Sequence, residues 1–157
     1  MGYVETVLQP GETLLYRGKL HWIIYVPGLS VGLLAILLVV GVFASIFDPF
    51  WSPMWIGVGV APLCLIIAVL MLAAAWLKRR TEEIAVTDRR IILKTGLIAR
   101  RTVEMNMDKV ESVDVSQAIL ARLLDYGTVV IRGTGTGRTR LHDVAEPLTF
   151  RAQVAAR

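Results

Sequence analysis

The sequence predicts a membrane-embedded helical hairpin followed by a small, mainly-β domain that ends in a short helix. Residues 22–77 are almost continuously apolar, and Asp48 is the only charged side chain among them. After Lys78, Arg79 and Arg80 the pattern changes to short alternating runs separated by turn residues, which is typical of antiparallel strands. These two observations define the predicted fold class.

The apolar segment divides into two predicted helices, 22–47 and 54–77, joined by the sequence Asp-Pro-Phe-Trp-Ser-Pro at 48–53. A helix rises about 1.5 Å per residue, so each run reaches about 36–39 Å and can cross a hydrocarbon core of about 30 Å. The alternative is a hairpin buried in a soluble core, but the chain has too few other residues to surround two such helices. The tryptophans favour the membrane, because all four lie at the ends of the runs, where an indole meets lipid headgroups: Trp22, Trp51, Trp55 and Trp76.

The basic residues predict the orientation of this hairpin. Arg17 and Lys19 precede the first run, the cluster at 78–80 follows the second, and the connecting turn has no Lys or Arg. Because basic residues stay on the cytoplasmic side, both termini are expected in the cytoplasm. The chain then consists of an N-terminal cytoplasmic segment (1–21), a transmembrane hairpin (22–77) and a cytoplasmic domain (78–157).

The composition of residues 78–157 bounds the possible partners. This part holds fifteen Lys and Arg against ten Asp and Glu, a net charge of +5. That balance favours proximity to anionic lipid, whereas no recognition-helix or stacking-aromatic pattern supports nucleic acid binding. Cys64 is the only cysteine and lies inside the second apolar run, so we interpret it as an apolar filler. No cofactor or metal is expected.

Short alternating runs predict the strands of the domain. The segment 13–18 is a predicted strand that cannot fold alone and is expected to join the C-terminal domain. Turn residues, including Asp88-Arg89, separate the others. The predicted strands after the hairpin are 82–87, 90–95, 97–105, 110–115, 128–132 and 138–143.

Two short helices complete the predicted domain. Residues 116–125 are expected to form a helix capped by Ser116, ended by Gly127 and carrying the i,i+4 pairs Ile119/Leu123 and Leu120/Leu124. A last helix should begin at Glu146-Pro147, with Phe150 and Val154 on one face. Alternation and helical spacing also predict a shared core, formed by Val113, Val115, Leu120, Leu123, Val129 and Ile131.

Three motifs have a chemical interpretation and a simpler one. The run Gly133–Gly137 with Arg138 and Arg140 could bind an anion, although glycines between two strands simply permit a hairpin turn. His142 and Asp143 are spaced as an acid–base pair, but no nucleophile accompanies them. The acids Asp108, Glu111 and Asp114 could bind a metal, although carboxylates alternating with valines are the ordinary solvated side of a strand.

Four stretches resemble the bacterial pleckstrin-homology-like (PH domain-containing) membrane proteins, in which such a domain follows a two-helix hairpin. They are 87–96 (TDRRIILKTG), 107–117 (MDKVESVDVSQ), 120–129 (LARLLDYGTV) and 133–135 (GTG). The resemblance implies a PH-like domain at 78–157, built as a partly open barrel of two antiparallel sheets and capped by the C-terminal helix. It also implies a place in the cell (inner) membrane. It carries no catalytic residue over to this chain.

The expected function is therefore non-catalytic. We expect a protein-interaction or assembly module, acting as a homo-oligomer or as an accessory subunit of a larger membrane complex, because barrel edges and a capped groove accept peptides. An enzyme is disfavoured, because no nucleophile, metal or cofactor constellation is recognisable. The alternative is binding of anionic lipid headgroups through basic side chains, namely Lys78, Arg79, Arg80, Arg89, Arg90, Arg132, Arg138 and Arg140. The sequence leaves the partner, the oligomeric state and the biological process open.

Overall fold

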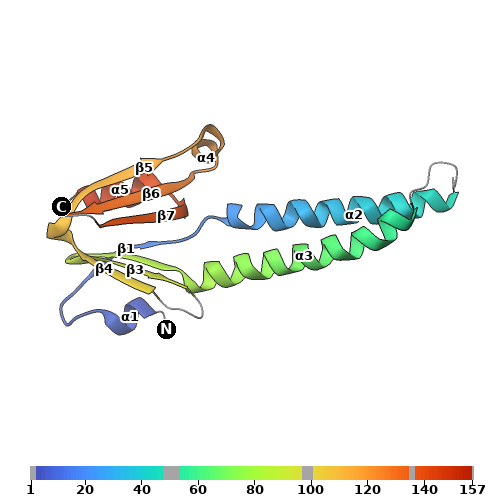
Figure 1. Cartoon of the computed structure of the whole chain (residues 1–157). Coiled ribbons are helices and arrows are strands. Elements are labelled where there is room, and N and C mark those ends of the chain that lie inside the picture. The colour runs from blue at the N-terminus through green and yellow to red at the C-terminus, as the bar shows by residue number, and fades with distance from the viewer. Residues whose placement is uncertain (1–2, 48–53, 97–100, 135–136, 157) are drawn as a thin grey trace. The chain divides into compact units, whose positions relative to one another are not determined.

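The computed structural model describes residues 3–47, 54–96, 101–134 and 137–156 (Figure 1). The chain divides into two compact units, an apolar helical unit at 22–77 and a mixed unit built from residues 1–21 and 78–157. The predicted turn at 48–53 with Trp51, the first residues of the predicted strand 97–105, and Gly135 and Thr136 lie outside the described residues.

The apolar unit consists of two long helices. A short 3₁₀ turn (Trp22–Tyr25) leads into α2 (Val26–Phe47), and the second helix, α3 (Met54–Thr81), continues through Lys78, Arg79 and Arg80. By length and composition both are long and apolar enough to cross a membrane, and only 11% of each helix's most apolar window is buried. The two predicted helices are therefore confirmed as helices.

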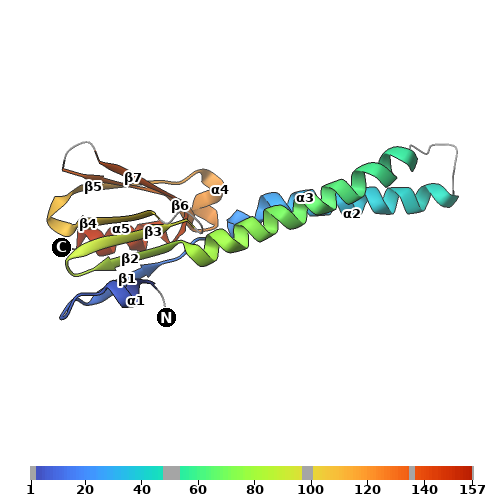
Figure 2. The same cartoon turned by 60° about the horizontal axis from the view of Figure 1, so that its bottom comes forward.

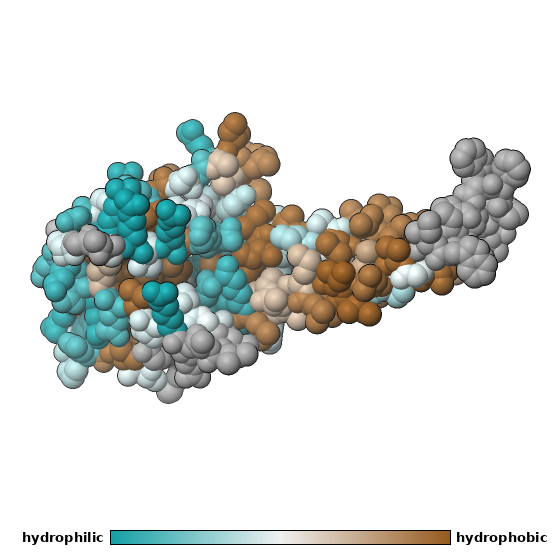
Figure 3. All heavy atoms as spheres, in the orientation of Figure 1, coloured by the Kyte–Doolittle hydropathy of each residue, from teal (hydrophilic) through white to brown (hydrophobic). Residues whose placement is uncertain are grey.

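Small residues form the contact between α2 and α3. Ala61, Ala68 and Ala75 are buried at intervals of seven residues on α3, and Ala35 is buried on α2. At Gly28 the helices approach so closely that a Cβ atom would lie 2.9 Å from Leu72 Cγ. Most of the large apolar side chains of the two helices are exposed, and Figure 3 shows them as a hydrophobic surface along the helices. The buried hydrophobic residues described in this unit are therefore alanines, whereas most of its large apolar side chains are exposed.

The second unit contains two antiparallel sheets. Their strand orders are β1-β2-β3-β4 and β5-β6-β7. The first sheet is formed by β1 (Leu14–Gly18), β2 (Glu83–Thr87), β3 (Arg90–Thr95) and β4 (Arg101–Asn106). The second is formed by β5 (Val110–Ser116), β6 (Tyr126–Gly133) and β7 (Arg138–Ala145). The predicted two antiparallel sheets are confirmed, and they do not close into a barrel.

The N-terminal segment connects the two sheets. β1 pairs with β2, so the predicted strand 13–18 does join the strands after the apolar helices. The residues that follow β1 reach β7, where Leu20 forms an isolated bridge with Val144. The His21 N–H donates to the Asp143 carbonyl at 2.7 Å, and the Ala145 N–H donates to the Lys19 carbonyl at 2.9 Å. Residues before the hairpin are thus part of the same unit as residues after it.

The core lies between the sheets and is covered by α5 (Pro147–Ala155), which contacts β1, β5 and β6. Phe150 is fully buried, and its ring meets Tyr16 edge-on at 6.0 Å. The start of this helix at Pro147 and the inward face of Phe150 and Val154 are confirmed. The buried core residues are Ile84, Val86, Ile91, Leu93, Val129, Ile131, Leu141, Val144, Phe150 and Val154.

A second small core was absent from the prediction. The short helix α1 (Tyr3–Val7) buries Val4 against Ala85 and Ile92 on the other face of the first sheet, beside which α1 lies in Figure 2. This explains why consecutive residues of β2 and β3 are buried, since both faces of these strands are covered.

The predicted helix 116–125 is wrong in its bounds and in its inward face. Only α4 (Ile119–Leu123) is helical, its N-cap is Ala118 without a side-chain cap, and Asp125 with φ 54° follows its end before Gly127. Leu120 and Leu123 are 69% and 80% exposed. Spacing places such leucines on one face but does not decide which face turns inward, and here the small Ala121 does.

The other four residues of the predicted core do contribute to the core. Val129 and Ile131 are fully buried, and Val113 and Val115 are partly buried against the core.

Candidate interaction surfaces

A groove runs between the edge strand β5 and the helix α5. It has a volume of about 550 Å³ and contains both apolar and charged side chains. Val110, Val113 and Val154 supply apolar surface from the two elements, and Arg151 stands exposed on the α5 side. The lining residues are Met107, Asp108, Val110, Glu111, Ser112, Val113, Asp114, Arg151, Val154 and Ala155.

The three acids noted in the sequence all line this groove. Asp108, Glu111 and Asp114 are exposed, which agrees with their interpretation as the solvated side of a strand. Asp114 also forms an ion pair with Arg132 at 2.9 Å. Among the described residues no group of His, Cys, Asp and Glu is arranged to hold a metal ion. The groove therefore has acidic side chains at its rim and apolar side chains between them.

The backbone of β5 gives this groove a further property. β5 lies at the edge of its sheet, and its pairing with β6 is regular from Ser112 to Ser116 after an irregularity at Val110/Ser112. An edge strand presents backbone N–H and C=O groups that an added extended segment can pair with, whereas a bulge limits such pairing. The regular stretch next to the groove is thus the part of β5 suited to receive a peptide.

Arg90, which the sequence assigned to a lipid-binding surface, is held in an ion-pair network. Its Nη2 lies 2.8 Å from Glu12 Oε2 and its Nη1 lies 2.6 Å from Glu104 Oε2, while its Nη2 also donates to the Val7 carbonyl. Thr87 Oγ1 donates to Glu12 Oε1 at 2.7 Å. The Arg90 side chain is 12% exposed and that of Glu12 is fully buried. The pair fastens the N-terminal segment to β2 and β3.

This network shifts the acid–base properties of both partners. The hydrogen bond from Arg90 lowers the pKa of Glu12 to about 2, against the opposing effect of burial. The same hydrogen bond raises the pKa of Arg90 above its ordinary value. A paired and hydrogen-bonded carboxylate stays ionised even where burial alone would favour its neutral form. Sequence reasoning missed the role of Glu12, because nothing near it indicates a partner 78 residues away.

The remaining predicted lipid-binding residues fall into two groups at opposite ends of the unit. Lys78, Arg79 and Arg80 lie in the last turn of α3, just before β2 begins, whereas Arg89 lies two residues after β2 ends. A five-residue strand spans about 15 Å. Hydrogen bonds from the Met107 N–H to the Arg89 carbonyl and from the Thr134 N–H to the Lys109 carbonyl place the 133–137 turn at the Arg89 end.

Three of these arginines share the outer face of the second sheet. Arg132 and Arg138 are directly opposite each other in the β6–β7 register, and Arg140 follows on the same side of β7. All three are exposed, and Arg132 is paired with Asp114. Arg89 lies 4.0 Å from Asp88 and lines a polar hollow of about 460 Å³ with Arg90, Asn106 and Asp108. The structure therefore does not gather the eight basic residues into one cluster.

The glycine run is closed as a hairpin turn in its described part. The Gly133 N–H donates to the Gly137 carbonyl at 3.2 Å. Gly133 is buried, and a Cβ atom there would lie 3.1 Å from Met105 Sδ. Close approach between strands thus explains one glycine of the run without a ligand.

The two histidines have structural contacts. His142 Nδ1 lies 3.4 Å from Thr128 Oγ1 on the neighbouring strand, and His21 stacks on Tyr126 with 5.1 Å between ring centroids. Asp143 has φ 58°, and the pairing of β7 with β6 is irregular between Leu141 and Val144. The contacts of His142 and Asp143 are those of a sheet.

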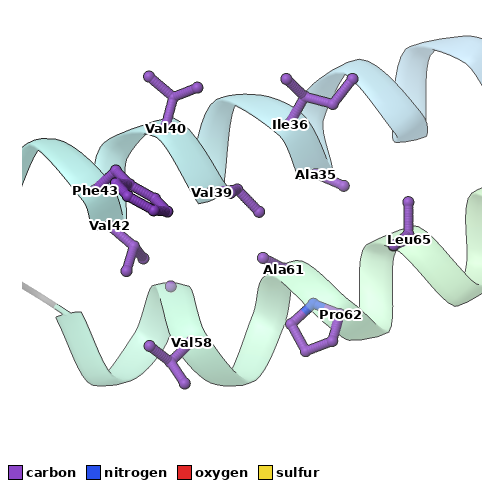
Figure 4. Close-up of a pocket in the computed structure, with 11 residues that line it drawn as sticks. Ala35, Ile36, Val39, Val40, Val42, Phe43, Val58, Ala61, Pro62 and Leu65 are labelled. Carbon is purple, nitrogen blue, oxygen red and sulfur yellow. The ribbon is translucent and has the colours of Figure 1, made fainter.

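An apolar hollow of about 440 Å³ lies between α2 and α3 within the helical unit (Figure 4). Phe43 and Val39 from α2 and Ala61 and Pro62 from α3 are among its lining residues, all of which are apolar. No side chain there could orient a polar substrate.

The model of the bacterial PH domain family matches residues 23–157, which includes both apolar helices and all the strands except β1. No curated protein and no solved structure matches the chain. The two antiparallel sheets and the C-terminal helix that packs into their core agree with that match. The chain therefore belongs to the bacterial PH domain family.

Proposed function

We propose that this protein is a membrane-anchored, non-catalytic interaction module. The apolar hairpin spans the cell (inner) membrane with both termini in the cytoplasm. The mixed unit of residues 1–21 and 78–157, called the PH-like unit below, binds a protein segment in the β5–α5 groove. It acts as an assembly module, either between copies of itself or as an accessory subunit of a larger membrane complex. Membership of the PH domain family supports the general role, because that family suggests a protein or lipid interaction module.

The exposed apolar side chains of the helical unit support the membrane part of this proposal. Leu33, Ile36, Phe43, Leu65 and Leu70 are each more than half exposed, although each is large and apolar. Burying one such side chain is worth about 1.5–3 kcal/mol, so leaving so many in water would be strongly unfavourable. A core helix of a soluble protein would be mostly buried, which these helices are not. Lipid, or further apolar helices within lipid, satisfies these surfaces.

The β5–α5 groove carries the interaction part of the proposal. Its valines offer apolar contact, β5 offers backbone pairing, and the rim bears Asp108, Glu111 and Asp114 against Arg151. Its charge favours an extended partner segment that combines apolar residues with Lys or Arg.

Site-specific crosslinking in native membranes tests this function. A photo-reactive residue in place of Glu111, on the rim of the groove, should capture a specific protein that mass spectrometry identifies. The same residue in place of Thr102, which is exposed on the edge strand of the other sheet, is the matched control. Charge reversal by Asp108→Lys should weaken the capture at position 111. Equal capture from both positions, or none from either, contradicts the groove as the binding site.

The alternative, binding of anionic headgroups by the basic residues, has weaker support. Arg90 is already bound by Glu12 and Glu104, and the arginine-bearing turns lie at the end of the unit away from Lys78. Native mass spectrometry of the full chain in detergent distinguishes the two functions. Lipid binding would be favoured if the chain retains more anionic than neutral lipid, and if the amount of bound anionic lipid decreases in the variants Arg138→Gln and Arg140→Gln.

A further inference from the structure

The short helix α4 displays its large side chains to solvent. Ile119, Leu120 and Leu123 are 90%, 69% and 80% exposed, and Leu124, which follows the helix, is 39% exposed. The one buried residue of the helix is Ala121. Figure 3 shows a hydrophobic cluster over α4, on a face of the unit that is otherwise largely hydrophilic. A contiguous apolar patch of this kind marks an interaction site.

The residues that flank α4 hold it in place through close contacts. The Gln117 Nε2 donates to the Tyr126 carbonyl at 2.9 Å. Gly127 packs so tightly that a Cβ atom would lie 2.8 Å from Gln117 Cγ and 3.0 Å from the Ser116 carbonyl oxygen. The outward direction of the leucines is therefore held by contacts on both sides of α4 and does not come from a loose loop.

The position of α4 within its unit points to the partner. Tyr126, two residues after Leu124, stacks on His21, and His21 is bonded to Trp22, the first residue of the apolar unit. The His21 N–H also donates to the Asp143 carbonyl. Burial raises the pKa of Glu82, just after α3, and the charge of Asp143 adds to this rise. Both chain connections to the apolar helices therefore leave the end of the unit that carries α4.

We propose that α4 is a second membrane contact, in which Ile119, Leu120, Leu123 and Leu124 insert into the interfacial layer of the leaflet that the hairpin crosses. This inference rests on the proposed function, since it needs the hairpin in the bilayer. The chemistry fits lipid, because exposed apolar side chains stand beside the basic Arg122 and share their end of the unit with Lys78, Arg79 and Arg80. The exposed acid Asp125 follows these residues.

This contact would also orient the interaction groove. With α4 in the leaflet, Ser116 at the α4 end of β5 would lie closer to the membrane than Val110 at the other end of the strand. Asp108 and Glu111 then face incoming partners. The membrane contact would thus lie beyond the Ser116 end of β5, whereas Asp108 and Glu111 of the groove lie at its Val110 end.

Fluorescence of the full chain in liposomes tests the inference. The environment-sensitive dye NBD is attached to a cysteine replacing Leu123, in a Cys64→Ala background, and the liposomes contain phosphatidylcholine and phosphatidylglycerol. A cysteine replacing Thr134, exposed at the far end of the unit, is the matched control. The dye at position 123 should emit at shorter wavelength and be quenched by lipids that carry a nitroxide near the headgroup. The dye at position 134 should show neither effect.

Each other result overturns the proposal in a recognisable way. Equal quenching at 123 and 134, in protein that resists alkaline extraction, removes the α4 contact and leaves the anchored module intact. A blue shift at 123 without lipid quenching means that protein covers α4. Release of the chain by alkaline extraction contradicts the proposed function itself, and the inference with it.

Discussion

Arg90 shows how burial decides what a single residue can do. Next to Asp88 and Arg89 in a turn, it has the sequence context of a solvated basic residue, yet in the fold it is 12% exposed and bonded to two carboxylates. A guanidinium in this state stabilises the fold and has little capacity left for a headgroup. Arg138 and Arg140, which are exposed, keep that capacity.

Glu12→Gln is expected to destabilise the PH-like unit strongly. Removing one partner of a buried ion pair leaves the other charge unpaired and costs about 3–5 kcal/mol, of which Glu104 can offset a part. Hydrogen exchange of residues 83–95 in the full chain measures the loss. Glu104→Gln is the control, because its exposed pair should contribute at most about 1 kcal/mol. Equal effects of the two changes would mean that the Glu12 pair does not fasten the N-terminal segment.

The ion pair of Glu12 also predicts that the fold loses stability in acid. The pKa of Glu12 is about 2 in the fold against an ordinary value of 4.5. Because the folded state binds the proton less readily, the carboxylate stabilises the fold above pH 4.5, and this contribution declines as the pH falls toward 2. Circular dichroism of the strands should show this decline in the native chain and a smaller one in Glu12→Gln. Identical acid profiles would contradict the assigned shift.

At the scale of elements, the short helices α4 and α5 of the PH-like unit have opposite roles, because α5 buries its large side chains and α4 exposes them. Phe150→Ala should cost about 3–5 kcal/mol, because a fully buried ring is removed from the core. Leu123→Ala should change the stability of the detergent-solubilised chain by less than about 0.5 kcal/mol, since exposed substitutions rarely do more. Chemical denaturation followed by β-sheet circular dichroism compares them. A large loss from Leu123→Ala would mean that α4 is packed in the protein.

Alternation and turn residues located most strands from the sequence, because a period of two is imposed locally by the sheet. The helix α5 could also be predicted from the sequence, because Pro147 marks its start and Phe150 marks its buried face. For α4 the spacing is equally compatible with leucines facing in or out. The decision depends on Ala121 and on the packing of Gly127 against Gln117, which are tertiary contacts.

The candidate site was less predictable than the fold. Asp108, Glu111 and Asp114 were recognised as a regular row, but the groove they border exists because α5 brings Arg151 and Val154 from later in the chain. The pairing of Glu12 with Arg90 has no local signal at all. Long-range packing, which composition and periodicity do not encode, determined both.

At the scale of the whole molecule, the two units follow opposite packing rules. The PH-like unit buries large residues such as Ile91 and Phe150, whereas the helical unit buries alanines and exposes leucines. The first rule is that of a protein folded in water, and the second is that of helices associating in lipid. The change of rule falls at residues 21–22 and 77–78, where the two units meet along the chain.

This division leads to a topology prediction. All the Lys and Arg residues lie outside 22–77, so both termini should be cytoplasmic and Ser52 should face the opposite side. In a Cys64→Ala background, a cysteine at Ser52 should react with an impermeant thiol reagent added to intact cells. A cysteine at Thr134 should react only after the membrane is permeabilised, which also shows that this cysteine is reactive. Labelling of Thr134→Cys in intact cells would reverse the orientation and move the β5–α5 groove away from cytoplasmic partners.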